Sequence, residues 1–188
     1  MITTFALMPE HFNNNGDQGN MEVLSAELAT VKAPHKAIVE IESADFVLLG
    51  DASRAAMRHY ETELEGLRPL VRDRFARGLA TLLVGSCYEF FANDLGLELR
   101  PVARRSEFVA GEYFGYRNTE FDLDPVTRNG LFVATSLFGP FLAKNPGYLS
   151  DLLFGLGIQP NLDPERLSWI EKIREVSGGE ALQTGRAS

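Results

Sequence analysis

The sequence contains one cysteine, one tryptophan and three histidines among 188 residues. Because Cys87 is the only cysteine, no disulfide can form within the chain, and we expect a reduced, cytoplasmic protein. No apolar run approaches the ~20 residues that a membrane-spanning helix needs, and the first residues do not have the pattern of a secretory signal. No histidines or cysteines have metal-ligand spacing, and no glycine-rich nucleotide-binding motif is present. We therefore expect no metal ion, no cofactor and no membrane span.

Acidic residues outnumber basic ones by 26 to 18, which gives a formal net charge of −8. Such a chain does not attract a phosphate backbone, so we expect no nucleic acid among its partners. Hydrophobic residues make up 45% of the chain and charged residues 23%, as in ordinary globular domains. We expect one domain over residues 1–176 and a flexible C-terminal tail over residues 177–188.

Short apolar runs alternate along the chain with stretches in which apolar residues recur at helical spacing. This alternation is typical of α/β proteins with a parallel sheet. Strands are predicted at 5–8, 38–41, 45–50, 79–84, 107–110 and 131–135. Helices are predicted from Asn20 to near Pro34, at 53–65, at 67–76 with Pro69 in the first turn, from Tyr88, and over most of the chain after Lys144.

Cys87 lies at the turn between the predicted strand 79–84 and the helix that follows it. A sharp turn of this kind exposes a side chain, and a helix N-terminus favours a thiolate, so the position suits a nucleophile. Free cysteines are also commonly small buried hydrophobic residues. Position alone leaves both interpretations open.

Four segments within residues 7–148 carry a more specific pattern. They read LMPEHFNNNGDQGN at 7–20, FVLLG at 46–50, LLVGSC at 82–87 and TSLFGPFLAKNP at 135–146. Together they resemble class I glutamine amidotransferases of the cobyric acid synthase type, most closely the glutaminase subunits of lipid II isoglutaminyl synthases. In that family the corresponding motifs are a Y-G-D-x-G-N loop, a strand with a glycine loop, a nucleophile elbow and the segment T-Y-L-H-G-P-x-L-x-K-N-P.

The resemblance implies a three-layer, flavodoxin-like α/β domain with a mixed, mostly parallel sheet. It also implies a glutaminase subunit that releases ammonia from glutamine through a thioester on Cys87. The partner would be a Mur-ligase-like, ATP-dependent synthetase in a heterodimer. The backbone amides of Gly50 and Tyr88 would stabilise the oxyanion, and Glu89 and Thr119 would lie in the substrate pocket.

The sequence departs from the family at the positions that carry the chemistry. Phe138 stands where the family has its catalytic histidine, and phenylalanine cannot transfer a proton. Thr119 replaces a second histidine in GEYFGYRNT at 111–119, and the family's C-G-G becomes Cys87-Tyr88-Glu89. Asp51 stands where a glycine is common. We interpret the chain as a degenerate amidotransferase-like subunit that is kept for binding.

Two enzymatic alternatives stay open at this stage. The first is an active glutaminase that uses Cys87 and an unidentified base to supply ammonia to the synthetase. The second is a different thiol-dependent transfer to or from an apolar substrate. In either case His11, just after the first predicted strand, could approach Cys87, although a solvent-exposed loop position explains this histidine equally well.

Arg100, Arg104 and Arg105 form a basic cluster in an otherwise acidic chain. Such a cluster could bind an anion or the acidic surface of a partner. It is also a common feature of solvated loops.

Overall fold

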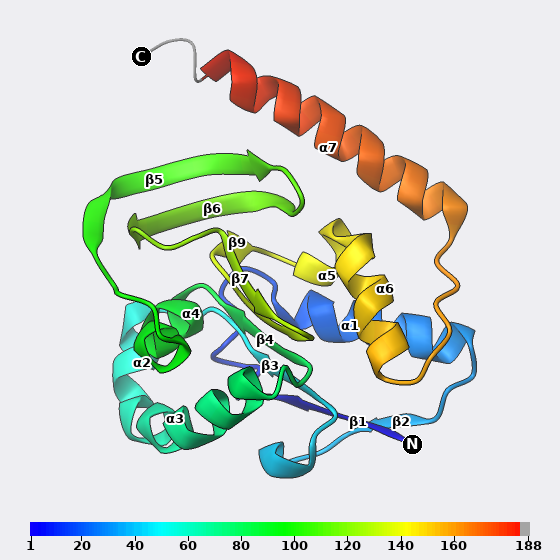
Figure 1. Cartoon of the computed structure of the whole chain (residues 1–188), viewed down its shortest axis with the longest axis horizontal. Coiled ribbons are helices and arrows are strands. Elements are labelled where there is room, and N and C mark those ends of the chain that lie inside the picture. Colours follow the sequence, from blue (N-terminus) through cyan, green and yellow to red (C-terminus); the bar gives the residue numbers. More distant parts are fainter. Residues whose placement is uncertain (185–188) are drawn as a thin grey trace.

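The main sheet of the protein has six strands in the order β2-β1-β3-β4-β8-β7 in the computed structural model (Figure 1). All neighbouring strands are parallel except β7, which pairs antiparallel with β8. The order of the five parallel strands is the 2-1-3-4-5 order of flavodoxin-like domains, with β8 as the fifth strand. The strands are β1 (Ile2–Ala6), β2 (His35–Ala37), β3 (Phe46–Leu49), β4 (Thr81–Val84), β7 (Val126–Asn129) and β8 (Phe132–Thr135). The expected α/β fold with a mixed, mostly parallel sheet is thus confirmed.

The structure describes the backbone of residues 1–184 and the side chains of residues 1–177. Within this part of the chain, no helix is both long and apolar enough to cross a membrane. Of the predicted tail at 177–188, residues 177–184 belong to α7 (Pro164–Thr184), and residues 185–188 lie outside the described residues.

Helices cover both faces of the sheet, because successive side chains of the central strands point to opposite faces. Phe46 and Leu48 of β3 pack in a cluster with residues of α1, α5 and α6. Val47 and Leu49 of the same strand pack in a second cluster with residues of α3 and α4. The strand is therefore buried on both sides, as its unbroken apolar sequence predicts. The helices are α1 (Gln18–Thr30), α2 (Arg54–His59), α3 (Glu61–Ala76), α4 (Ser86–Phe91), α5 (Phe141–Lys144) and α6 (Pro146–Gly155), with short 3-10 turns η1 (Ile41–Ser43) and η2 (Ala92–Leu95).

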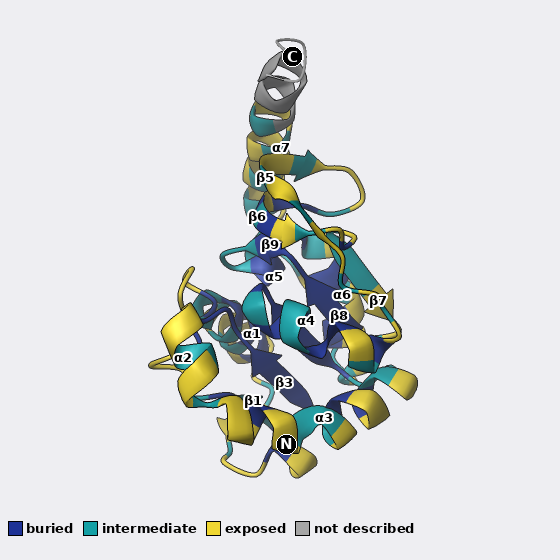
Figure 2. Ribbon diagram, turned by 90° about the vertical axis from the view of Figure 1, so that its left-hand side faces the viewer, coloured by how far each residue is buried: buried dark blue, intermediate teal, exposed yellow. Residues whose placement is uncertain are grey.

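A second, three-stranded sheet stands beside the main one and consists of β5 (Pro101–Ala110), β6 (Phe114–Phe121) and β9 (Leu137–Phe138). Its strands are antiparallel. In Figure 1, α7 lies next to β5, and Arg174 of this helix donates hydrogen bonds to the carbonyls of Gly111 and Glu112. Figure 2 shows that β5 and the described part of α7 are mostly exposed or half-buried, whereas the central strands β3 and β8 of the main sheet are buried.

Several predicted boundaries are wrong. The first strand begins at Ile2 rather than Phe5, and the predicted strand at 38–41 is replaced by β2 at His35–Ala37. The helical segment breaks at Tyr60, so Pro69 lies inside α3 and not in its first turn. Asn20 is not an N-cap, since α1 already begins at Gln18.

Candidate functional site

The sharp turn from β4 into α4, which we call the elbow, has Gly85 at its tip. Gly85 has φ 56° and ψ −117°, a conformation that is strained for any residue with a side chain. Its amide donates to the carbonyl of Thr135 at 2.8 Å, which fixes the tip against β8. In strand-turn-helix sites the nucleophile occupies this strained tip. Here the tip residue has no side chain.

Cys87 lies two residues beyond the tip, inside α4, and its side chain is 0% exposed. It belongs to the hydrophobic cluster between α4, α3 and the sheet. Burial raises the pKa of the Cys87 thiol well above its usual range, and the nearby carboxylates of Asp51 and Asp17 raise it further. The expectation that the turn exposes a thiolate is therefore wrong, because the turn projects residue 85 and the helix carries residue 87 into the core.

A cavity of about 340 Å³, the elbow cavity, lies above Gly85 at the carboxyl ends of the parallel strands. Open α/β sheets bind ligands at this edge. Three of the residues selected from the sequence meet here, namely Glu89, Thr119 and Phe138. Gly50, Cys87 and Tyr88 do not line the cavity. Its lining also includes Asp51, Ser86 and Phe121.

The carboxylate of Asp51 occupies the polar floor of this cavity. Its Oδ1 accepts a hydrogen bond from the Ser86 amide at 2.8 Å, and its Oδ2 accepts from the side-chain amides of Asn14 at 3.0 Å and Asn15 at 2.7 Å. In an elbow site, the amide after the tip residue is an oxyanion-hole donor. That donor is engaged here by a carboxylate of the chain itself.

The space above Gly85 is closed from two sides. A Cβ atom on Gly85 would lie 2.4 Å from Asp51 Oδ1 and 2.9 Å from Phe138 Cε1. Phe138 is held there by β9, where it pairs with Tyr116 of β6. No side chain fits at the tip without movement of these neighbours.

Gly50 and Tyr88, whose backbone amides are the two expected oxyanion donors, do not line the elbow cavity, and their other contacts belong to the fold. A Cβ atom on Gly50 would lie 2.1 Å from the carbonyl oxygen of Phe12, so only glycine allows the two backbones to come this close. The ring of Tyr88 is buried, and its hydroxyl group lies 2.7 Å from Thr127 Oγ1. Neither residue presents a side chain to the cavity.

Glu89 is the half-buried acid of the elbow cavity. Its Oε1 accepts a hydrogen bond from the hydroxyl of Thr119 at 2.9 Å. Burial raises the pKa of Glu89 above its usual value, whereas the Thr119 hydrogen bond lowers it. Glu89 lies one helical turn beyond the tip, and its carboxyl group forms an acidic wall of the cavity.

Asp17 lies beneath the cavity and is fully buried. Its Oδ2 accepts the amide hydrogen of Asp51 at 2.9 Å, while its Oδ1 has no hydrogen-bond partner among the residues that the structure describes. Burial, together with the charge of the neighbouring Asp51, raises the pKa of Asp17 to about 6, although the hydrogen bond from the Asp51 amide and the cation of Lys144 partly offset this rise. Lys144 in turn donates to the carbonyl of Phe138.

Of the remaining candidates from the sequence, Arg104 also lines the elbow cavity, whereas His11, Arg100 and Arg105 do not. His11 packs against Tyr60, with ring centroids 5.1 Å apart, and does not line the elbow cavity. The predicted basic cluster is divided among separate partners rather than focused on one point. Its hydrogen bonds and ion pairs are Arg100 with Glu98, Arg104 with Asn118, and Arg105 with Asp122.

The sequence interpretation missed Gly85 as the tip residue and noted Asp51 only as a departure. A signal was present, because the family's C-G-G also matches Gly85-Ser86-Cys87 if the comparison is shifted by two residues. With Gly85 as the tip, the next two residues are small, Ser86 and Cys87. With Cys87 as the tip, they would be the larger Tyr88 and Glu89.

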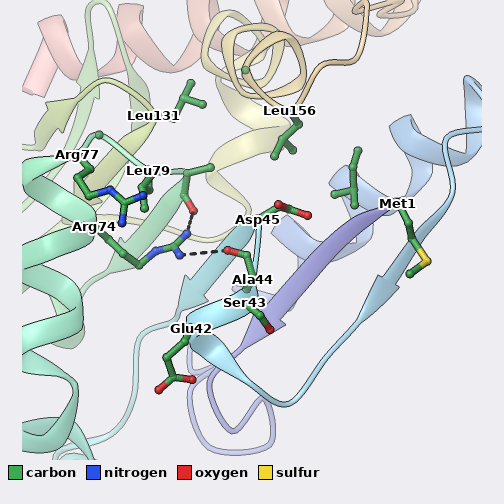
Figure 3. Close-up of a pocket in the computed structure, with 14 residues that line it drawn as sticks. Met1, Glu42, Ser43, Ala44, Asp45, Arg74, Arg77, Leu79, Leu131 and Leu156 are labelled. Atoms are coloured by element: carbon green, nitrogen blue, oxygen red, sulfur yellow. Dashed lines mark hydrogen bonds between the residues drawn. The ribbon is translucent and has the colours of Figure 1, made fainter.

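A larger cavity of about 560 Å³ lies at the opposite, amino ends of the strands (Figure 3). Its buried Arg74 donates to Thr81 Oγ1 and to the carbonyls of Ala44 and Ala80. These bonds tie α3 to the starts of β3 and β4. Since all three acceptors belong to the fold itself, the contacts of Arg74 are structural.

No group of three or more histidine, cysteine or acidic side chains in the described part of the chain is placed to hold a metal ion. No family model matches the sequence, and no curated protein matches it. Among solved structures, a glutamine amidotransferase from Thermotoga maritima is similar over 95% of this chain and 94% of that chain, with a TM-score of 0.44 and 14% sequence identity.

Proposed function

We propose that this chain is a glutamine amidotransferase-like subunit that has lost glutaminase chemistry and acts by binding. The observation that carries the proposal is the elbow: its tip is Gly85, which has no nucleophile. The next amide, that of Ser86, is already bonded to Asp51, and Phe138 covers the tip. The nearest thiol, Cys87, is buried and held protonated.

The parts of the sequence that match the resemblance support a role as a scaffold. Asn20 accepts the Leu142 amide at 2.9 Å, and so joins α1 to α5. Asn145 bonds to both the amide and the carbonyl of Phe114, at 2.7 and 3.1 Å, and so joins α5 to the second sheet. Both asparagines belong to the segments that resemble the family, and both have roles in the fold rather than in chemistry.

The partner that we propose is a Mur-ligase-like, ATP-dependent synthetase, by the resemblance of segments 7–20 and 135–146 to the glutaminase subunit of such a pair. The two proteins would form a heterodimer. In this arrangement the synthetase takes free ammonia, since the present chain supplies none. A reconstituted complex should therefore amidate its acceptor with an ammonium salt and not with glutamine.

The first test is alkylation by a glutamine-mimicking diazoketone, followed by intact-mass measurement, with Cys87→Ala as the matched control. The expected result is no adduct on either protein and no release of ammonia from glutamine, with or without the bound synthetase. A stoichiometric adduct on the wild type alone would show that Cys87 reaches glutamine, and the active-glutaminase alternative would replace this proposal.

A further inference from the structure

The helix α7 contributes little to the core of the domain. None of its described side chains, at residues 164–177, is buried, and none belongs to either hydrophobic cluster. In Figure 2 this part of the helix carries only the colours of exposed and half-buried residues. Helices of globular proteins gain most of their stability by packing an apolar face against a neighbour. The domain itself therefore provides α7 with little of that packing.

Polar contacts hold α7 on the domain. Arg166 forms an ion pair with Glu27 of α1. Arg174 donates hydrogen bonds to the carbonyls of Gly111 and Glu112, in the turn between β5 and β6. The two arginines in the described part of the helix are thus both bonded to the domain.

An apolar stripe runs along another side of the helix. Trp169, Ile173 and Val176 follow one another at intervals of four and three residues, which places them on one face. Their exposed fractions are 58%, 53% and 65%. Single exposed apolar side chains are common on proteins, whereas a group of them on one face marks an interaction site. We call these three residues the α7 stripe.

The exposed charges of α7 are mainly acidic. In the described part of the helix, the exposed charged residues are Glu165, Glu171, Glu175 and Lys172. Lys172 lies over the ring of Trp169, with its Nζ 4.8 Å from the centroid, so this cation already has a partner. The outer side of α7 is therefore acidic, as is the chain as a whole with its net charge of −8.

These charges determine what can cover the α7 stripe. A second copy of the chain would bring the same glutamates close to those of the first, and like charges across an interface are unfavourable. Anionic lipid headgroups would be repelled for the same reason. A protein surface with an apolar centre and a border of lysines and arginines matches the stripe in both hydrophobicity and charge.

We propose that α7 is the docking helix for the partner protein, with the α7 stripe against an apolar surface that is bordered by lysines and arginines. Tryptophan side chains carry much of the binding energy in protein interfaces, so Trp169 is the main anchor. The inference rests on the proposed function, since it takes the partner to be the synthetase named there. It adds the surface through which the two proteins associate.

The first test uses the fluorescence of Trp169, which is the only tryptophan in the chain. The probes are two synthetic helical peptides without tryptophan that share one leucine stripe, bordered by lysines in one peptide and by glutamates in the other. Titration of the full chain with the lysine peptide should shift the emission to shorter wavelengths and reach saturation, because the indole leaves water. We expect the glutamate peptide to bind at least about tenfold more weakly. Equal binding of the two peptides, or no shift with either, would overturn the proposal.

Val176→Ser and Val39→Ser are the matched variants, because both valines are exposed and only Val176 belongs to the α7 stripe. Serine and valine have similar helix propensities, so Val176→Ser should leave the helix formed, as circular dichroism would check. We expect it to weaken binding of the lysine peptide by about fivefold or more, and Val39→Ser to change it by less than about twofold. Equal effects of the two variants would place the peptide elsewhere on the acidic chain and contradict the proposal.

Glu175→Lys and Glu10→Lys test the charge in the same way. Each replaces an exposed glutamate and changes the net charge of the chain equally, so their effects on non-specific attraction are the same. We expect Glu175→Lys to weaken binding of the lysine peptide at least about threefold more than Glu10→Lys does. Equal losses would mean that the peptide responds to net charge alone, and the proposal would fail.

Sedimentation of the full chain tests a second copy as the occupant of the α7 stripe. We expect a monomer in the absence of partner and peptide. A dimer that Val176→Ser dissociates would make the second copy the occupant and overturn the proposal.

Failure of this proposal can be told apart from failure of the proposed function. A diazoketone adduct on Cys87 would overturn the loss of glutaminase chemistry whatever the peptides do. Absence of the adduct together with no shift of the Trp169 emission would overturn only the docking surface.

Discussion

The carboxylate of Asp51 accepts a hydrogen bond from the backbone amide of Ser86 at 2.8 Å. A side chain from the loop after β3 thereby holds the first amide of α4. The same carboxylate accepts the side-chain amides of Asn14 and Asn15. Three loops at the carboxyl edge of the sheet meet at this one group, and it occupies the place where a reacting oxygen would need a donor.

Replacing this carboxylate should destabilise the elbow. Asp51→Ala leaves three donors without their acceptor, and we expect it to lower the free energy of unfolding by about 2 to 4 kcal/mol. Asp51→Asn keeps one acceptor oxygen and should cost less. Urea denaturation of both variants measures the difference. If Asp51→Ala costs no more than a surface substitution, the carboxylate does not hold the three loops together.

Gly85→Ala should be among the most destabilising single-methyl additions in the chain. The new Cβ would lie 2.4 Å from Asp51 Oδ1, and the alanine at position 85 would have to keep a φ of +56°. We expect a loss of about 3 kcal/mol or more in the free energy of unfolding. Thermal or urea denaturation would measure it.

Gly96→Ala is the matched control, because Gly96 also has a positive φ, +76°, yet has nothing within 4 Å of the added Cβ. It should cost only about 1 kcal/mol, from backbone strain alone. In the Asp51→Gly background, which removes part of the crowding, Gly85→Ala should cost less than in the wild type, and a double-mutant cycle would measure this coupling. Equal costs for the two alanine variants would mean that the tip has room for a side chain.

The strands that were predicted well are those whose apolar runs are unbroken, such as β3 and β4, because burial on both faces leaves a clear pattern. β6 was missed and β5 was predicted only at 107–110. Their side chains alternate weakly and are largely polar, since the second sheet is partly exposed. Pairing between distant segments defines these strands, and no local pattern encodes it.

The site was predictable only in part for a similar reason. The resemblance singled out Glu89, Thr119 and Phe138, and the structure places all three in the lining of one cavity. The sequence interpretation placed the tip two residues too late, at Cys87, because a cysteine is the natural candidate for a nucleophile. The backbone conformation of Gly85 cannot be recognised from the sequence. That Asp51 would turn toward the Ser86 amide depends on three-dimensional contacts alone.

Cys87 should react slowly with thiol reagents in the folded protein. Its side chain is fully buried and burial raises its pKa, so the thiolate is scarce and shielded. We expect alkylation by iodoacetamide at pH 8 to be at least about a hundredfold slower than in the urea-unfolded chain, because it requires local opening. Mass spectrometry over time gives both rates. Comparable rates in the two states would place the thiol at the surface.

Asp17 should make stability fall as the pH rises through weakly acidic values. Burial raises the pKa of its carboxyl from 3.8 to about 6 in the folded protein, so the folded state holds this proton more tightly than the unfolded chain does. The stabilisation is complete below pH 3.8 and is lost as the pH rises through about 6, with a total of about 3 kcal/mol. Asp17→Asn stays neutral and can still accept the Asp51 amide, so the variant should lack this contribution. Urea denaturation between pH 4 and pH 7 would test it: the wild type should lose stability relative to Asp17→Asn across this window. A constant difference between the two proteins would mean that Asp17 titrates as an ordinary exposed carboxylate.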